Sequence, residues 1–211
     1  MTENQRFIQS DTFINKVLLV AIVLVAAYQL YATGHIPAFP TDDDGAYAAA
    51  GYQIWQTGKP GVSGYKDVAG MGQDIYVLGH IGAAAQGLAM KLFGVSVVTA
   101  LLPSVLIGFA VLAMVCLLGR QLWNLTIGLL AALLLGLSGV FFSASHSARP
   151  DLLVALFLLI ALWLIASASD EWPYLRLALS GLVMGLSGDV HPNGFLLAPL
   201  PLVFWVLLRK P

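Results

Sequence analysis

Long apolar stretches recur along the whole chain and are the strongest pattern in its sequence. A helix crosses the hydrocarbon core of a bilayer with about 20 mostly apolar residues, and somewhat fewer suffice where the bilayer thins. Six stretches qualify, the last two being the shortest: residues 17–32, 95–119, 125–142, 152–168, 175–186 and 195–208. The pattern predicts an all-α polytopic transmembrane helical bundle of about six spans, forming a single transmembrane domain over residues 1–211.

The first stretch is predicted to be an uncleaved anchor and not a signal peptide. Arg6 and Lys16 precede it, but its apolar run is long and no good small-residue cleavage site follows. The next polar segment, residues 34–94, is too long to be a simple connection between two spans. We therefore expect this loop to have structure of its own.

Helical spacing predicts two juxtamembrane helices within that loop. In residues 44–57, apolar and aromatic side chains recur near helical spacing, which favours a helix lying in the membrane interface. The glycine-rich residues 58–72 predict an irregular loop. In residues 73–93, apolar residues again follow a helical period with little charge, and we expect the second juxtamembrane helix there.

Composition narrows the class of protein further. Hydrophobic residues make up 59% of the chain and charged residues only 10%, against roughly 25% charged residues in an ordinary soluble domain. A soluble globular fold is excluded. The formal net charge of −1 offers no basic surplus for phosphate neutralisation, so no nucleic-acid partner is expected. The single cysteine, Cys116, can form neither an intramolecular disulfide nor a zinc site on its own.

Basic residues near the helix ends predict the orientation in the membrane. With a cytoplasmic N-terminus and alternating spans, one side receives Arg6, Lys16, Arg120, Arg176, Arg209 and Lys210. The positive-inside rule then favours cytoplasmic N- and C-termini. Three polar segments fall together on the extracytoplasmic face: residues 34–94, 145–151 and 188–194. The span centres hold no Asp, Glu, Lys, Arg or His, which weighs against a transporter or channel.

Three consecutive acids, Asp42, Asp43 and Asp44, open the first juxtamembrane helix. One aspartate is explained by capping, because it accepts hydrogen bonds from free N–H groups and complements the helix dipole. Three exceed that need. A carboxylate at a membrane face can act as general base toward a hydroxyl acceptor, or hold a divalent cation beside a phosphate. A capping role and a chemical role both remain open for these three residues.

The extracytoplasmic corner before the fourth span contains a cation at a helix start. Pro150 and Asp151 suit the first turn of a helix, but Arg149 is not needed there. A guanidinium beside free helix N–H groups is suited to binding a phosphate. We therefore interpret Arg149 as functional and the nearby His146 as a polar boundary residue.

The corner before the sixth span is first of all a turn, as Pro192, Asn193 and Gly194 indicate. Asp189 and His191 could both bind one metal ion only in a turn or extended backbone, and two such residues are a weak signal. A purely structural turn and a functional site remain equally open interpretations of this corner. Asp44, Asp189 and His191 are the weak candidates for ligands of a divalent metal ion. Gly181 and Gly185 form a small-xxx-small pattern, which predicts close helix packing.

The order of these features resembles a known family. An acidic pair is followed by an alanine-rich helix with a tyrosine (residues 43–50), and further matching stretches occupy residues 91–95, 102–104, 117–120 and 148–157. In this order, they resemble the GT-C membrane glycosyltransferases, within which the branch of protein O-mannosyltransferases and lipid A aminoarabinose transferases is the most similar. Relatives typically continue through further helices, so the chain resembles the N-terminal part of the family.

The resemblance implies a function and roles for particular residues. It implies inverting transfer of a hexosyl or pentosyl group from a polyprenyl-phosphate-linked donor to a lipid, glycan or protein acceptor, at the extracytoplasmic face. Asp43 takes the position of the catalytic aspartate and Asp44 that of the second acid, which supports it or a metal ion. Arg149 would bind the donor phosphate. The expected rim of the site consists of Asp42, Tyr47, Asp151, Asp189 and His191.

These expectations place the protein as a multi-pass integral protein of a bacterial inner or plasma membrane. Two alternatives remain open. The first is a non-catalytic subunit or truncated chain, which would keep the fold and rely on a second chain for the missing helices. The second, with less weight, is a transporter.

Overall fold

The computed structural model describes residues 3–35, 42–58, 80–167 and 172–208. Every regular element within these ranges is a helix. The helices are α1 (Glu3–His35), α2 (Asp42–Thr57), α3 (His80–Phe93), α4 (Val97–Leu122), α5 (Leu125–Gly136), α6 (Gly139–Ser145), α7 (Asp151–Ala166), α8 (Pro173–Val190), α9 (Asn193–Leu197) and α10 (Leu200–Leu208). The predicted all-α class is confirmed.

Two helices are long and apolar enough to cross a membrane by themselves. They are the segment Thr12–His35 of α1 and the whole of α4. The pair α5 and α6 makes a third candidate, although the two helices are bent by 72° relative to each other. Helix α7 and the segment Asn193–Leu208 are apolar but shorter. By length and composition, the described helices therefore give two or three spans, and the predicted count of about six is not confirmed.

The third predicted span, residues 125–142, is not one continuous helix. Helix α5 ends at Gly136, and α6 begins at Gly139. Between them, Ser138 adopts an extended conformation, and its hydroxyl accepts a hydrogen bond of 3.2 Å from the N–H of Phe141. A serine in this position satisfies a free N–H group at a helix start, so it stabilises a new helix at this point. The prediction missed this cap because the run around it is apolar.

Both juxtamembrane helices are present. Helix α2 has nearly the predicted bounds, and α3 covers the later part of the predicted second helix. The predicted irregular loop at 58–72 and the start of that second helix lie almost wholly outside the described residues. After α3, Gly94 adopts a φ of +84°, a conformation that glycine reaches at little cost at the end of a helix. Ser96 and Thr99 then form a capping box at the start of α4.

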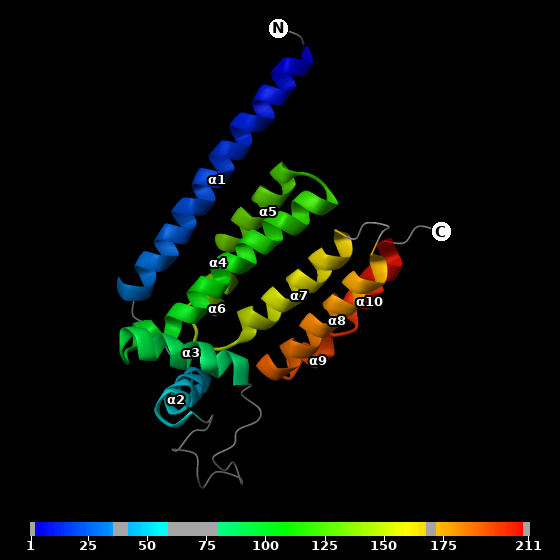
Figure 1. The fold of residues 1–211 in the computed structure, drawn as a ribbon. Helices are drawn as coiled ribbons and strands as arrows, with labels where there is room; N and C mark the ends of the chain where they lie inside the picture. The colour runs from blue at the N-terminus through cyan, green and yellow to red at the C-terminus, as the bar shows by residue number, and fades with distance from the viewer. Residues whose placement is uncertain (1–2, 36–41, 59–79, 168–171, 209–211) are drawn as a thin grey trace.

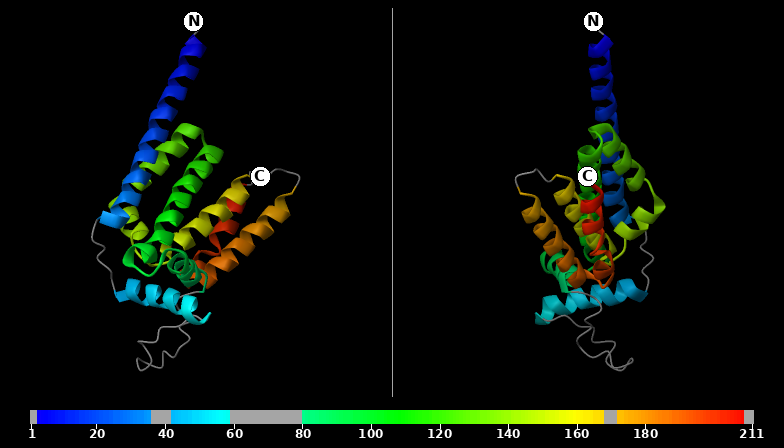
Figure 2. Two further views of the ribbon diagram at one scale, coloured as in Figure 1. Left: turned by 60° about the vertical axis from the view of Figure 1, so that its left-hand side comes forward. Right: turned by 90° about the vertical axis from the view of Figure 1, so that its right-hand side faces the viewer.

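The arrangement places α2 and α3 across one end of the bundle. Figure 1 shows α1, α4 and α5 side by side, with α7, α8 and α10 on the other side of α4. The corner between α6 and α7 (residues 146–150) and the turn between α8 and α9 lie at the same end as α2 and α3, and Figure 2 shows α2 crossing beneath that end. The described parts of the three polar segments therefore meet at one end, as expected, and we call it the polar end.

Helix α4 contacts α5 most closely where two glycines meet. A Cβ atom added to Gly128 would lie 2.3 Å from the main-chain oxygen of Cys116, and one added to Gly119 would lie 2.6 Å from Cα of Gly128. The close packing predicted for Gly181 and Gly185 is wrong among the described residues, because a Cβ atom added there meets none of their atoms within 4 Å. A small-xxx-small pattern permits a close approach, but the neighbouring helix decides where it happens.

We expect Gly128→Ala to destabilise the protein by about 1–3 kcal/mol, because the clash is with main chain that cannot rotate away. The matched control is Gly181→Ala, the same change in an open helical position, where alanine should be neutral or stabilising by about 0.5–1 kcal/mol. Thermal unfolding in detergent measures both. Equal effects of the two substitutions would contradict the close approach of α4 and α5.

Candidate functional site

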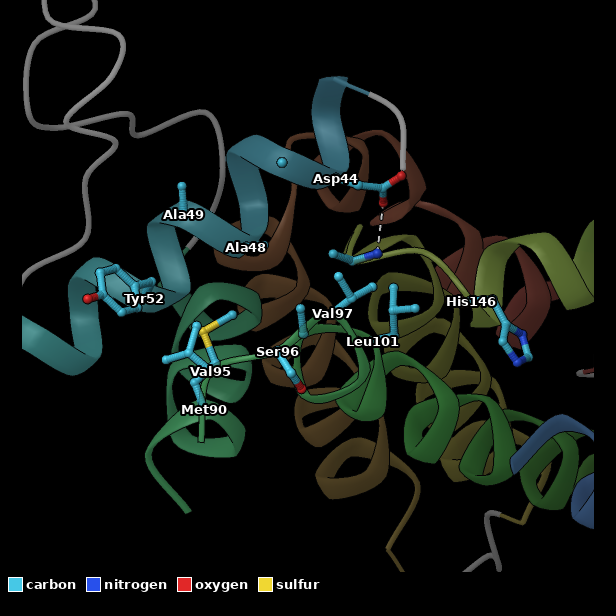
Figure 3. Close-up of a pocket in the computed structure, with 13 residues that line it drawn as sticks. Asp44, Ala48, Ala49, Tyr52, Met90, Val95, Ser96, Val97, Leu101 and His146 are labelled. Carbon is cyan, nitrogen blue, oxygen red and sulfur yellow. Dashed lines mark hydrogen bonds between the residues drawn. The ribbon is translucent and has the colours of Figure 1, made fainter. Parts of the chain in front are cut away.

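The Asp44 carboxylate ties the start of α2 to the α6–α7 corner. Asp44 is buried, with 6% of its surface exposed. Its Oδ1 atom accepts a hydrogen bond of 2.5 Å from the Ser147 hydroxyl and one of 2.8 Å from the N–H of Ala148. Figure 3 shows the carboxylate directed at the main chain of the corner. Segments more than 100 residues apart are thereby joined at one carboxylate oxygen.

A buried amide holds the same corner from the other side. Gln86 of α3 is 4% exposed, and its Nε2 atom donates to the main-chain oxygen of Ala148. The N–H and the C=O of Ala148 are therefore both bound, one by α2 and one by α3. The sequence analysis missed Gln86. Its signal was a polar side chain at helical spacing with the small or apolar residues Ala83 and Met90, which are also buried.

Apolar contacts complete the attachment of α2. Tyr47 is 5% exposed and packs with Leu101 of α4 and Ala148 of the corner. Helices α2 and α3 approach closely as well, since a Cβ atom added to Gly87 would lie 2.5 Å from the main-chain oxygen of Gly51. Tyr47, which we expected at the rim of the site, lies instead in the packed layer between α2 and the rest of the bundle.

Asp42 and Asp43 belong to the first turn of α2 by their main chain. Their side chains lie outside what the structure describes. The role of Asp43 as the catalytic aspartate therefore stays a prediction. Its main chain directly precedes Asp44, whose carboxylate is fixed to the corner.

A cavity of about 370 Å³ lies between α2, α3 and the start of α4. Most of its lining is apolar, and Figure 3 shows Ala48, Met90, Val97 and Leu101 around it. Few polar residues are among the lining, namely Asp44, Tyr52, Ser96 and His146. The remaining lining residues are Gly45, Ala49, Val95, Ala100 and Ala148. Such a cavity suits an apolar chain with a polar end group near Asp44.

Arg149 and Asp151 form an ion pair over the start of α7. The Arg149 Nε atom lies 2.9 Å from the Asp151 Oδ2 atom, and both side chains are about two-fifths exposed, at 38% and 42%. Pro150 occupies the N-cap and provides no side-chain hydrogen bond to the first turn. The Arg149 side chain is thus held at the start of α7 and is partly exposed, an arrangement that suits the binding of a phosphate.

Asp189 and His191 take separate partners. The Asp189 Oδ1 atom lies 3.1 Å from Nδ1 of His80, which links the end of α8 to the start of α3. His191 accepts a hydrogen bond of 3.1 Å from the N–H of Asn193, as its place in a turn predicts. His80 was not among the expected site residues, although it stands at the start of a juxtamembrane helix.

The three weak candidates for metal ligands do not form a cluster. Within the described part of the chain, no group of three or more His, Cys, Asp or Glu side chains is placed to hold a metal ion. Asp44 instead binds the corner, Asp189 pairs with His80 and His191 closes its turn. The side chains of Asp42 and Asp43 lie outside this search.

The corner and the His80–Asp189 pair are neighbours across Pro150. A Cβ atom added to Gly82 at the start of α3 would lie 3.0 Å from the Cβ atom of Pro150. Behind this contact, Leu153, Val154 and Val190 form an apolar cluster that Ile81 covers. The structure therefore gathers Asp44 of α2, Arg149 of the corner, Asp151 of α7 and Asp189 of α8 at the polar end.

Asp44→Ala should destabilise the protein by about 1–3 kcal/mol, because the Ser147 hydroxyl and the buried Ala148 N–H lose their acceptor. Asp44→Asn is the matched variant, since the amide oxygen can still accept both hydrogen bonds and only the charge is lost. We expect Asn to retain most of the stability in detergent unfolding. If Asn and Ala were equally destabilising, the two hydrogen bonds would not be what holds α2.

Comparison with known proteins gives one match. Residues 80–210 match the family described as dolichyl-phosphate-mannose-protein mannosyltransferase. The matched segment runs from α3 through α10 and includes Arg149 and the His80–Asp189 pair, whereas α2 precedes it. No curated protein and no solved structure matches the chain. Since the match covers more than half of the sequence, the chain belongs to the dolichyl-phosphate-mannose-protein mannosyltransferase family, which consists of membrane glycosyltransferases of the GT-C kind.

Proposed function

We propose that the chain transfers a sugar from a polyprenyl-phosphate-linked donor to a lipid, glycan or protein acceptor at the polar end of the bundle. One observation carries the proposal. The segment that matches the glycosyltransferase family contains the Arg149 corner, and buried Asp44 binds that corner to the acidic start of α2. Asp43, the expected base, and Arg149, the expected ligand of the donor phosphate, are thus each next in the chain to a residue of the Asp44–Ala148 hydrogen bond.

The proposed reaction is a single inverting displacement. The acceptor oxygen forms a bond to the anomeric carbon while the bond from that carbon to the donor phosphate breaks, and the lipid phosphate leaves with the electron pair. Asp43 takes the proton of the acceptor hydroxyl. Arg149 stabilises the charge that develops on the phosphate, which is where electrostatic stabilisation contributes most.

Asp44 has a different part in this proposal. Its Oδ1 atom is engaged by Ser147 and Ala148, so we assign it to positioning the first turn of α2 against the corner. The apolar cavity beside it would accommodate part of a lipid chain, with the reacting group at the Asp44 end. In the membrane, we propose that the polar end is extracytoplasmic and that the N-terminus is cytoplasmic, in keeping with the distribution of basic residues.

The test is sugar transfer by the reconstituted wild-type chain. Proteoliposomes receive a polyprenyl phosphate that carries a radiolabelled sugar, together with candidate lipid, glycan and peptide acceptors. We expect label to appear in one acceptor class, with release of one lipid phosphate for each sugar transferred.

No transfer by an inserted, folded chain would contradict the proposal. If a co-purifying second polypeptide then restored transfer, the chain would be a subunit of an enzyme. Label crossing the membrane on an unaltered solute, without transfer, would favour a transporter.

A further inference from the structure

Helix α1 has little apolar packing to hold it against the rest of the bundle. In its most apolar 18-residue window, only 6% is buried, against 33% for α4. The buried residues of α1 gather near its end and include two polar ones, Gln29 at 1% exposed and Thr33 at 7%. A buried amide in a membrane-spanning segment is costly unless every polar atom has a partner.

The Gln29 side chain contacts the last residue of α5 and the last residue of α6. Its Nε2 atom donates a hydrogen bond of 3.2 Å to the main-chain oxygen of Gly136, directly before the break. Its Oε1 atom accepts a hydrogen bond of 3.2 Å from the hydroxyl of Ser145, the last residue of α6. Its main-chain oxygen lies 3.0 Å from Nε2 of His146 at the start of the corner. Thr33 reaches the same main-chain oxygen at 2.9 Å.

The contact with Gly136 substitutes for a helical hydrogen bond. In a continuous helix, the Gly136 carbonyl would accept from the N–H of Val140, but that residue lies in α6, beyond the 72° bend. A free carbonyl at membrane depth needs another donor. The Gln29 amide is that donor, so a side chain of α1 satisfies the main-chain carbonyl at the break between α5 and α6.

Side-chain packing at the bend is incomplete on this side, although the rings of Tyr28 and Phe142 are in contact with their centroids 6.1 Å apart. A cavity of about 460 Å³ lies between α1 and the break, lined by Leu24, Val25, Tyr28, Gln29, Gly136, Leu137, Gly139 and Phe142. The polar contacts of Gln29 therefore hold the direction of α6 where side-chain packing is incomplete.

We propose that Gln29 is a positioning residue of the transfer site, acting through α6. Its side chain bridges the end of α5 and the end of the bent α6, and the corner that follows presents Ser147 and Ala148 to Asp44. This inference rests on the proposed function for its catalytic part. Two sets of hydrogen bonds, one from Gln29 to Ser145 and His146 and one from Ser147 and Ala148 to Asp44, are thus connected through consecutive residues of the chain.

The experiment uses the full chain in proteoliposomes and a near-isosteric substitution, Gln29→Met. Leu30→Met is the matched control, because Leu30 is the next residue of α1 and is 51% exposed. Spin labels at Val23 and Val140, which are 58% and 84% exposed, report the direction of α6 relative to α1 in a Cys116→Ser background. Each variant is assayed for kcat, for the donor KM and for the distance distribution between the labels.

We expect Gln29→Met to lower kcat about tenfold, since small displacements of catalytic groups cost this much or more, while the donor KM stays unchanged. The distance distribution should broaden, and Leu30→Met should match the wild type in all three readouts. A simple anchoring role would lower the amount of inserted protein and leave kcat and the distances as they are.

Either an unchanged kcat or an unchanged distance distribution in Gln29→Met overturns the proposal. If the wild type itself transfers no sugar, the proposed function fails separately. The distances then decide alone whether Gln29 sets the direction of α6, with broadening in support and an unchanged distribution against.

Discussion

Asp43→Asn should reduce sugar transfer by about a hundredfold to ten-thousandfold, the range typical of losing a general base. Asparagine has almost the same size but cannot take the proton of an acceptor hydroxyl. Asp43 lies in the first turn of α2, and that turn is fixed to the Arg149 corner through Asp44. The fold should therefore persist while the chemistry stops.

Initial rates in proteoliposomes at matched protein levels measure this effect. Thr57→Ala is the control at the other end of α2, where the Thr57 hydroxyl donates within the helix to the main-chain oxygen of Gln53. It should transfer sugar at the wild-type rate. Near-normal transfer by Asp43→Asn would remove Asp43 from the mechanism, and an equal loss in Thr57→Ala would mean that disturbing α2 anywhere is enough.

Arg149→Ala should raise the donor KM by about tenfold to a hundredfold, because charge-assisted hydrogen bonds to a phosphate are the stronger class. The acceptor KM should change little. Arg149 is already held in place by Asp151 at 2.9 Å and stays partly exposed, so the wild-type guanidinium needs little ordering to bind a phosphate.

Two further variants refine this result. Arg149→Lys keeps the charge but loses the planar fork that matches phosphate, so we expect an intermediate donor KM. Asp151→Asn removes the ion-pair partner and leaves the cation in place, with a smaller effect than loss of Arg149. Donor and acceptor KM values that rise equally in Arg149→Ala would show that the residue does not bind the donor phosphate.

The sequence predicted those parts of the fold that depend on periodicity. The helix expected at 44–57 is observed at Asp42–Thr57, because small and aromatic residues at helical spacing determine its buried face. The sidedness of the polar segments followed from alternation of the apolar stretches. The break within residues 125–142 was missed, since a capping serine in an apolar run leaves the hydropathy almost unchanged.

The site was predictable only in its general location. An acidic helix start and an arginine before a helix are local signals, and both lie at the polar end. Which partners these residues bind depends on how the helices pack, and that packing cannot be deduced from one sequence. Asp44 therefore proved to bind the corner, and Asp189 to pair with His80. Gln29 and Gln86 were overlooked because their roles exist only through contacts with distant helices.

The most direct test of the account is to map where the donor binds. A polyprenyl phosphate with a photoreactive group beside its phosphate is crosslinked to the wild-type chain and located by mass spectrometry. The account predicts labelling of α2 and the α6–α7 corner, competed by excess donor and weakened in Arg149→Ala. Labelling at the opposite end, around the α4–α5 connection, or corner labelling that excess donor does not reduce, would contradict it.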